Sequence, residues 1–320
     1  MIVQSDAISL PFADKSVDLV LGSPPYCDCR TYGIGAQRDC QPWIDWMLVV
    51  TTEALRVSSG AVIWVAAGVT RDRNYWPACE GLMYEWWKRG GSMYRPCYWH
   101  RVGIPGSGGD QWFRADVEHV MCFKRPGRLP FTDNTAMGHP PKWAPGGEMS
   151  YRMADGARTN QWGKAVTGDG DPGKWTERGV DGQLKQVKRK PSHVVVENKR
   201  YPTRKNQDGI HGEKRIGAPR YQGVAVANPG TLIQTAVGFG HLGDKMAHES
   251  EAPYPEKLAE FFVRSLCPEG GIVLDPFSGS GTTAKVAETF GRIGIGSDIR
   301  ASQTALTKRR LNRVQKQLFA

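Results

Sequence analysis

The segment GIVLDPFSGSGTT (271–283) decides the fold, because it has the order of a buried strand, a glycine-rich turn and the start of a helix. Gly279 and Gly281 let the backbone approach a ligand closely, and the helix that begins at Thr282 favours the ligand's negative end at its N-terminus. The next strand, RIGIGSD, ends in Asp298, where an acidic side chain can accept hydrogen bonds from ribose hydroxyls. Together these features predict a nucleotide-type cofactor site beside a parallel sheet.

Two other cofactor classes are excluded by what surrounds the glycines. The turn lacks the Gly-Lys-Ser/Thr end that would hold a triphosphate. VGFGHLG (237–243) has the spacing of a dinucleotide-binding loop, but prolines follow after nine residues and leave no room for the helix such a loop requires. The predicted cofactor is therefore an adenosine compound without a phosphate chain, and a nicotinamide dehydrogenase is rejected.

Hydrophobic periodicity extends this α/β pattern to both ends of the chain. Continuous apolar runs of strand length and apolar residues at helical spacing alternate, which is typical of a mostly parallel sheet covered on its faces. Two neighbouring segments, 93–102 and 115–125, have the pattern of an antiparallel pair at the sheet edge. The predicted strands are 1–4, 17–22, 60–68, 271–275 and 292–298, and the predicted helices are 43–57, 79–89, 255–267, 282–291 and 301–318.

A second motif, SPPY (23–26), follows the apolar strand VDLVLG. Two consecutive prolines remove two backbone donors and fix two φ angles, so the strand ends in a rigid corner. Taken alone, this is also compatible with a structural turn. Ser23 is not predicted to be a covalent nucleophile, because no His and acid partner is evident beside it and the chain has no G-x-S-x-G elbow.

Charge and composition divide the chain into three parts, 1–126, 127–249 and 250–320. The net charge is +10, and residues 127–249 hold 19 Lys and Arg against 12 Asp and Glu, which is +7 of that total. A polyanionic partner is expected, since clustered basic residues neutralise phosphates. The insertion 127–249 is compatible with a disordered, solvated loop, but its interleaved Trp and Tyr residues favour contact with nucleic acid.

Other classes of protein are disfavoured by what the sequence lacks. No apolar stretch reaches the length of a membrane span and the N-terminus lacks a signal peptide, so a soluble, cytoplasmic protein is expected. Seven cysteines without a C-x-x-C pair indicate free thiols. The seven histidines lack ligand spacing, and no bound metal is expected.

GSPPY after an apolar strand, followed far downstream by DPFSGSGTT, resembles the amino-methyltransferases of DNA, which use S-adenosylmethionine. The order of the motifs resembles the circularly permuted beta class, and the resemblance covers about 1–125 and 250–320. It implies a Rossmann-like methyltransferase fold in which residues 1–6 form the strand that normally follows the last helix. The cofactor-binding residues it implies are Asp6, Pro255, Asp275, Phe277, Gly279, Gly281, Thr282 and Asp298.

The same resemblance assigns the catalytic roles to Ser23, Pro24, Pro25 and Tyr26. The Ser23 hydroxyl and the Pro24 carbonyl would accept hydrogen bonds from an exocyclic amine, while Tyr26 would stack on a base extruded from the duplex. The prolines would give the rigidity that electrostatic preorganisation needs. Ser in the first position is more typical of cytosine N4 enzymes than of adenine N6 enzymes. The resemblance also places EHVMCFKR (118–125) beside the target base.

The expected function is methylation of duplex DNA, with residues 127–249 recognising the target. Two alternatives stay open: a methyltransferase of the same fold that acts on RNA or a protein amide, and a nucleic-acid-binding relative without catalysis. Relatives that act on RNA or protein usually have Asn at the Ser23 position and need no large basic insertion. A restriction endonuclease counterpart and a homodimer are possible partners that the sequence leaves open.

Overall fold

The computed structural model describes residues 1–27, 40–103, 113–139, 226–237, 246, 249 and 253–318, together with the backbone of 175–178 and 184–187. Side chains in the last helix are described as far as Arg313. The chain forms two units, one from 1–139 and 228–320 and the other from 140–227. In the second unit the described residues are 226–227 and an antiparallel pair, β9 (Trp175–Arg178) and β10 (Leu184–Val187).

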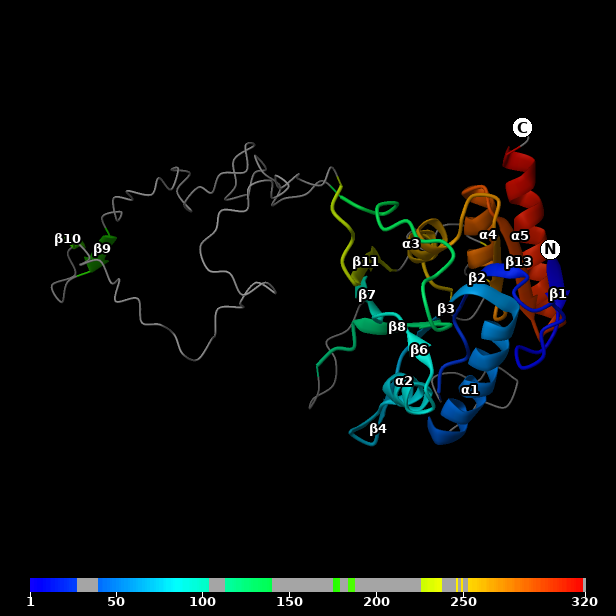
Figure 1. Ribbon diagram of the computed structural model, residues 1–320, viewed down its shortest axis with the longest axis horizontal. Coiled ribbons are helices and arrows are strands. Elements are labelled where there is room, and N and C mark those ends of the chain that lie inside the picture. Colours follow the sequence, from blue (N-terminus) through cyan, green and yellow to red (C-terminus); the bar gives the residue numbers. More distant parts are fainter. Residues whose placement is uncertain are drawn as a thin grey trace, which may run out of the picture. The chain divides into compact units, whose positions relative to one another are not determined.

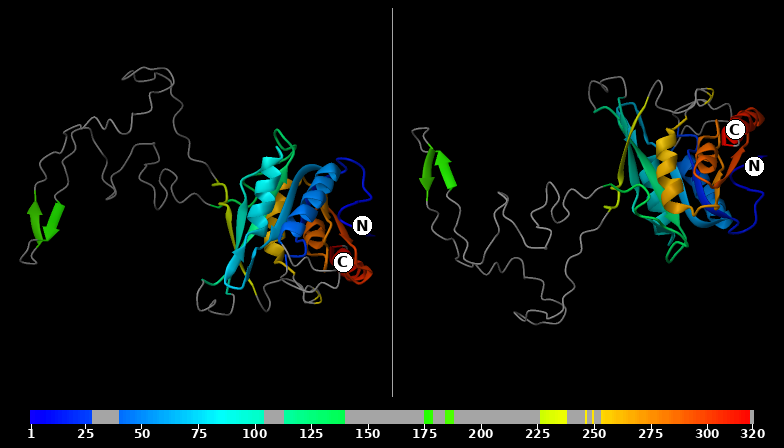
Figure 2. Two further views of the ribbon diagram at one scale, coloured as in Figure 1. Left: turned by 90° about the horizontal axis from the view of Figure 1, so that it is seen from below. Right: turned by 90° about the horizontal axis from the view of Figure 1, so that it is seen from above.

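A nine-stranded sheet forms the centre of the first unit (Figures 1 and 2). Along it, every described neighbour pair is parallel except those of β8, which runs antiparallel to β3, β7 and the short β6. The strands in spatial order are β1 (Ile2–Gln4), β13 (Ile293–Asp298), β12 (Ile272–Asp275), β2 (Val17–Gly22), β3 (Ser58–Ala66), β8 (Val117–Lys124), β7 (Cys97–Val102) and β11 (Leu232–Ala236), and β6 (Ser92–Met93) pairs with β8. The predicted mostly parallel fold with an antiparallel pair is confirmed.

The pair β7–β8 is not the outermost part of the sheet, because β11 lies beyond β7 in parallel register. Ile233 pairs with Trp99, and the Trp99 indole donates a hydrogen bond to Thr235 Oγ1 at 2.7 Å. Residues 232–236 fall in the segment assigned to the insertion, so part of that segment belongs to the sheet. A small hairpin, β4 (Val69–Arg71) with β5 (Asn74–Trp76), was not predicted either.

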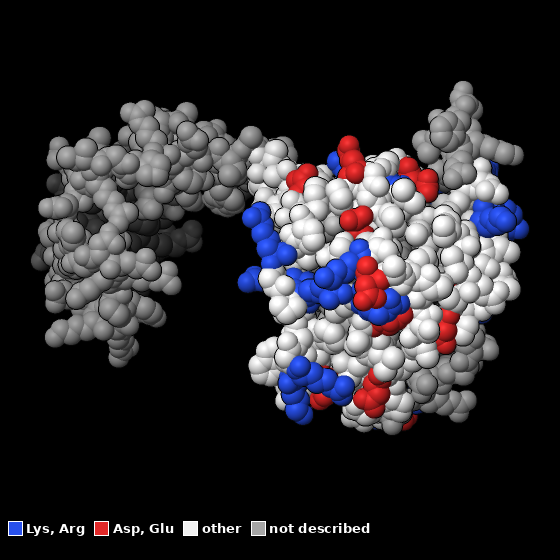
Figure 3. All heavy atoms as spheres, turned by 45° about the vertical axis from the view of Figure 1, so that its right-hand side comes forward, with Lys and Arg blue, Asp and Glu red and all other residues white. Residues whose placement is uncertain are grey.

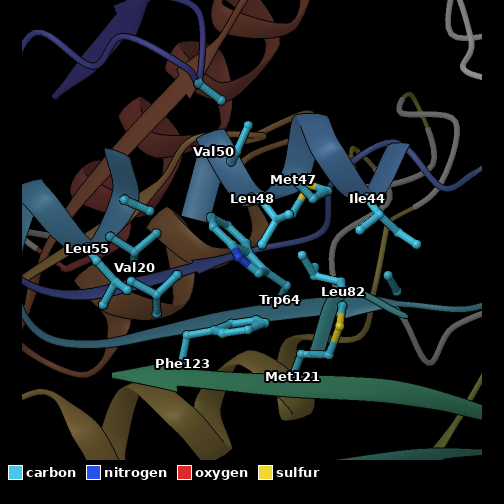
Figure 4. Packing of buried hydrophobic residues seen from close by; sticks show 14 of the residues in the cluster. Val20, Ile44, Met47, Leu48, Val50, Leu55, Trp64, Leu82, Met121 and Phe123 are labelled. Atoms are coloured by element: carbon cyan, nitrogen blue, oxygen red, sulfur yellow. The ribbon is translucent and has the colours of Figure 1, made fainter. Parts of the chain in front are cut away.

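Helices cover both faces of the sheet, and each face has its own apolar cluster (Figure 2). One face is covered by α1 (Cys40–Val57) and α2 (Ala78–Lys88), and the other by α3 (Glu256–Leu266), α4 (Thr282–Thr289) and α5 (Ala301–Leu318). Trp64 of β3 fills the space between α1 and β8, where it faces Phe123 (Figure 4). Its indole nitrogen donates to Thr51 Oγ1 at 3.0 Å, so this large core side chain leaves no polar atom unpaired.

The N-terminal strand occupies the position predicted for a permuted chain. β1 pairs with β13 in parallel, the Met1 amino group donates to the Gly294 carbonyl at 3.0 Å, and α5 packs against both strands. In Figure 1, β1 lies beside the last helix, α5. Within the described part of the chain, no helix has both the length and the apolar character that crossing a bilayer requires.

Candidate active site

Four acidic or polar residues lie at the carboxyl ends of four neighbouring parallel strands. Asp298 ends β13 and Asp275 ends β12, Ser23 directly follows β2, and Asp6 follows β1 by two residues. From β12 the chain continues to β13 on one side of the sheet, and from β2 it continues to β3 on the other side. The strand order therefore reverses its direction between β12, which ends at Asp275, and β2, which Ser23 follows. In open α/β sheets, ligands bind at such a topological switch point.

The glycine turn after β12 is fixed by the two strand-end acids. Phe277 N–H donates to Asp275 Oδ1 at 2.9 Å, and Gly279 N–H donates to Asp298 Oδ2 at 3.1 Å. Gly279 has a φ of 48° and Gly281 a φ of 80°, both in the left-handed region that favours glycine. The turn is thus held in one shape, and Asp298 serves it as an acceptor in addition to its predicted role toward ribose.

Gly281 and Thr282 are packed against α5. A Cβ on Gly281 would lie 2.6 Å from the Thr307 methyl group, so this glycine is needed for close packing of the chain itself. Thr282 is buried, and its hydroxyl accepts a hydrogen bond from Arg310 at 3.1 Å. Both residues therefore support the shape of the turn through their contacts with α5. The sequence predicted another role for Gly281, which was to let a ligand approach the backbone.

Asp275 is buried and hydrogen-bonded. Thr283 Oγ1 lies 2.7 Å from Asp275 Oδ2, and Tyr254 is in turn hydrogen-bonded to Thr283. Burial raises the pKa of Asp275 to about 7, and the charge of Asp298 acts in the same direction, whereas hydrogen bonds from Thr283 and from the Phe277 N–H oppose the shift. This carboxyl group therefore changes its protonation state near neutral pH.

The raised pKa of Asp275 predicts a loss of stability with rising pH. The folded state holds the proton up to pH of about 7, while the unfolded chain releases it near the usual 3.8. Between these values the free energy of unfolding should fall by up to about 1.4 kcal/mol per pH unit from this group. Asp275→Asn should reduce that slope in denaturant unfolding between pH 4 and 7, while exposed Asp45→Asn should not. An unchanged slope in Asp275→Asn would contradict the shift.

Pro255 begins α3 and helps place Tyr254. Its backbone is extended, with φ −65° and ψ 144°, and its carbonyl accepts the Leu258 N–H at 3.0 Å. This is consistent with a proline at a helix start, where no backbone donor is needed. Tyr254, directly before it, is buried beside Thr283. The segment thus lies against the glycine turn.

The SPPY corner is anchored from α1. Trp43 Nε1 donates to the Pro25 carbonyl at 2.7 Å, and Pro24 is buried. The backbone directly before the corner lies against the start of the glycine turn, because a Cβ on Gly22 would lie 2.6 Å from Asp275 Oδ1 and 3.5 Å from the Phe277 ring. The two motifs, about 250 residues apart in the sequence, therefore meet.

Phe277 adds an aromatic contact between these two motifs and the core. Its ring meets Trp46 and Trp64 edge to face, at centroid distances of 5.8 and 5.7 Å. Asp6, by contrast, is exposed, and its carboxylate accepts the Ile8 N–H at 3.1 Å within its own turn. Of the predicted cofactor residues, Asp6 is thus the one most open to solvent at the same edge of the sheet.

Two charged residues at this site, the buried Glu118 and the partly exposed Arg101, were not identified individually from the sequence. Tyr26 Oη lies 2.5 Å from Glu118 Oε2, and Glu118 Oε1 lies 2.9 Å from Arg101 Nη1. Ser23 Oγ lies 3.5 Å from Tyr26 Oη. The signal that was available is an acid at the second position of the apolar strand 117–124.

Charge is mixed elsewhere on this unit. On the face shown in Figure 3, groups of Lys and Arg side chains are interrupted by acidic ones. The basic cluster 185–190 and most of the aromatic residues that accompany it lie outside the residues whose side chains are described. Among the described residues, no group of three or more His, Cys, Asp or Glu side chains could hold a metal ion.

Comparison with protein families gives a match to the DNA methylase model of N6 and N4 methyltransferases over residues 17–309. The chain belongs to this DNA methylase family. The resemblance to this family that the two motifs indicated is therefore confirmed. The match includes the SPPY corner, the insertion and the glycine turn.

Individual DNA methylases match over shorter stretches. The orphan methyltransferase M.BamHII of Bacillus amyloliquefaciens is 47% identical over 68 residues, which is 21% of this chain and 26% of that protein. The type II methyltransferase M.HpaI of Haemophilus parainfluenzae is 45% identical over 86 residues, 27% of either chain. These alignments span about a quarter of the relatives' length.

Solved structures support the fold over nearly the whole chain. The PvuII DNA methyltransferase, titled as cytosine-N4-specific, has a TM-score of 0.58 at 16% identity, covering 98% of this chain and 89% of its own. A Thermus thermophilus structure, titled as a candidate DNA modification methylase complexed with S-adenosyl-L-methionine, has a TM-score of 0.53 at 20% identity, covering 98% and 93%. At these identities the likeness establishes the fold.

Proposed function

We propose that this DNA methylase transfers a methyl group from S-adenosylmethionine to the exocyclic amine of a base flipped out of duplex DNA, with cytosine N4 as the favoured target. The observation that carries this proposal is the contact between the two motifs: Gly22, directly before the SPPY corner, lies against Asp275 of the glycine turn. Because the corner and the turn meet at the switch point of the sheet, a cofactor and a base can be held side by side.

The residues of the turn fit an adenosine cofactor without phosphates. The acids at the ends of β13 and β12, and the absence of Lys from the turn, suit hydroxyl groups better than phosphates. Asp298 would hold the ribose hydroxyls, Asp6 would lie near the adenine, and Phe277 would supply an apolar wall. When bound, S-adenosylmethionine supplies an electrophilic methyl group on a positively charged sulfur.

The SPPY corner supplies what a weakly nucleophilic amine requires. The lone pair of an exocyclic amine is delocalised into the ring, and acceptors placed beside its hydrogens favour a pyramidal nitrogen. The Ser23 hydroxyl and the Pro24 carbonyl are proposed as those acceptors, and Tyr26 as the surface on which the base stacks. The Pro25 carbonyl is already occupied by Trp43, which keeps the corner from turning.

The choice of base rests on Ser23. Ser in the first position is more typical of cytosine N4 enzymes in the family that the motifs resemble. The PvuII enzyme is titled as cytosine-N4-specific, but at 16% identity it supports the fold and not the base. Among the relatives, one is named an orphan methyltransferase and another a type II methyltransferase, so their names leave a restriction endonuclease counterpart open.

The experiment that tests the function is incubation of the full chain with duplex DNA and methyl-labelled S-adenosylmethionine, followed by nucleoside mass spectrometry. Label on N4-methylcytosine is expected. Label on N6-methyladenine would correct the base, and label on neither base would overturn the proposal. RNA and protein offered in competition should not reduce the label on DNA. Recognition by residues 127–249 would be tested by exchanging that segment, which should change the methylated sequence.

Asp298 gives a prediction for cofactor affinity. Asp298→Asn keeps an oxygen acceptor for the Gly279 N–H and loses the charge that strengthens hydrogen bonds to ribose hydroxyls. The Kd for S-adenosylmethionine, measured by calorimetry, should rise about 10- to 100-fold, whereas kcat at saturating cofactor should change much less. An unchanged Kd would show that Asp298 serves the turn and not the cofactor.

A further inference from the structure

Glu118, which is buried, and Arg101, which is partly exposed, form an ion pair next to Tyr26 of the SPPY corner. Glu118 lies at the start of β8, and its side chain is 6% exposed. Its Oε1 is 2.9 Å from Arg101 Nη1, and Arg101 also donates to the Ala115 carbonyl. The second carboxylate oxygen, Oε2, lies 2.5 Å from the Tyr26 hydroxyl. An ionised carboxylate in such a place needs partners, and Tyr26 is one of them.

The chemistry of these groups fixes the direction of their hydrogen bonds. A carboxylate only accepts, so the hydroxyl of Tyr26 must donate to Glu118. Burial and then the charge of Glu118 hold the pKa of the Tyr26 phenol well above its ordinary value, so Tyr26 keeps its proton. With that proton directed away, the Tyr26 oxygen faces the Ser23 hydroxyl, 3.5 Å away, as an acceptor.

The same direction determines how Ser23 presents itself. A serine hydroxyl has one proton and two lone pairs. If its proton points to Tyr26, both lone pairs are free to accept an amine hydrogen. We propose that Glu118 is a positioning residue that sets the hydrogen-bond direction from Ser23 to Tyr26 and so makes Ser23 an acceptor for the target amine. Arg101 holds the Glu118 carboxylate in place. The part of this inference that concerns kcat rests on the proposed function.

The distance of 3.5 Å between Ser23 and Tyr26 is long for a hydroxyl pair. Catalytic hydrogen bonds are often long without substrate and shorten in the complex. The Tyr26 contact to Glu118 is already short, so the acceptor end of the series is in place before a base arrives.

The decisive variant is Glu118→Gln, which keeps the shape but offers an amide that can donate to Tyr26 and reverse the direction. We expect kcat to fall about 10- to 100-fold, with the Kd values for S-adenosylmethionine and DNA unchanged. Tyr26→Phe should lower kcat as well, and the double variant should be no slower than the slower single variant, because both break one series of bonds.

Glu80→Gln is the matched control. Glu80 accepts from the Tyr75 hydroxyl at 2.9 Å and pairs with His119 at 3.4 Å, which is similar chemistry outside the site. Its kcat should equal that of the wild type. A wild-type kcat in Glu118→Gln, or single losses that multiply in the double variant, would overturn the inference. A loss of affinity for both S-adenosylmethionine and DNA in Glu118→Gln would also overturn the inference, since it would indicate a structural role for Glu118.

A measurement without turnover separates this inference from the proposed function. The groups that face the Tyr26 hydroxyl are Glu118, Ser23 and the Cys79 thiol. In the full chain labelled with ¹³Cζ-tyrosine, the Tyr26 signal is assigned from its loss in Tyr26→Phe. Glu118→Gln should lower the pKa of Tyr26, and Glu80→Gln should not. An unchanged Tyr26 pKa would overturn the Glu118 contact whether or not methylation is observed.

Discussion

Ser23→Ala is expected to lower kcat by about 10²- to 10³-fold, the range found when one preorganised hydrogen-bonding group is removed from a reacting centre. The methyl side chain of alanine cannot accept an amine hydrogen, while the backbone of the corner keeps its Trp43 contact at Pro25. The Kd for S-adenosylmethionine should hardly change, because Ser23 lies on the β2 side of the switch point. Steady-state methylation and calorimetry measure the two quantities.

The control for this variant is Ser16→Ala. Ser16 stands directly before β2, is exposed, and donates to the Ala13 carbonyl at 2.7 Å. Ser16→Ala therefore removes the same hydroxyl oxygen as Ser23→Ala, but at the opposite end of β2. This variant should keep the wild-type kcat. Equal losses of kcat and cofactor affinity in Ser23→Ala would contradict the separation between a catalytic corner and a cofactor turn.

The parallel part of the sheet could be predicted because its signals are local. A buried parallel strand is a continuous apolar run, and the turn after it carries its own glycines, so 17–22 and 271–275 were found within two residues of β2 and β12. The acids at the strand ends follow from the same local reading. Their assembly at one edge follows in turn from parallel pairing.

The parts that could not be predicted depend on distant or atypical partners. The turn of the β4–β5 hairpin places Asp72 and Arg73 at φ values of 49° and 63°, without the glycine that usually marks such a turn. β11 has only five residues, LIQTA, two of them polar, within a polar, glycine-rich region, and its position depends on pairing with β7. No local pattern indicates that partner.

The same limit applies to the site. Tyr26 and Glu118 are 92 residues apart. The resemblance placed the segment 118–125 beside the target base, but no pattern in that segment indicates that Glu118 bonds to Tyr26. Asp298 was predicted for ribose, and its bond to the Gly279 N–H appears only in three dimensions. Motifs thus predicted the residues proposed to meet the ligands, whereas the residues that hold them in place required the fold.

Arg310 is the clearest example of a residue that holds the glycine turn in place. Among the variants considered, Arg310→Ala should lower the free energy of unfolding the most. Arg310 is fully buried on α5, and one of its nitrogens donates to the Ser280 carbonyl at 3.2 Å and to Thr282 Oγ1 at 3.1 Å. Its second terminal nitrogen, Nη2, donates to Glu256 Oε1 at 2.7 Å. Arg310→Ala leaves a cavity, unpaired acceptors in the glycine turn and a carboxylate with Lys285 as its remaining described cation.

Breaking a buried ion pair by removing one partner costs about 3 to 5 kcal/mol, and the pairing of Lys285 with Glu256 favours the lower end for Arg310→Ala. Denaturant unfolding should show this loss, while Arg313→Ala, an exposed change on the same helix, should stay within about 0.5 kcal/mol. Because Arg310 supports Ser280 and Thr282, saturating S-adenosylmethionine should recover part of the stability if it binds that turn. Wild-type stability in Arg310→Ala would mean that the turn keeps its shape without the guanidinium, and the packing of Gly281 against Thr307 would then be its main support.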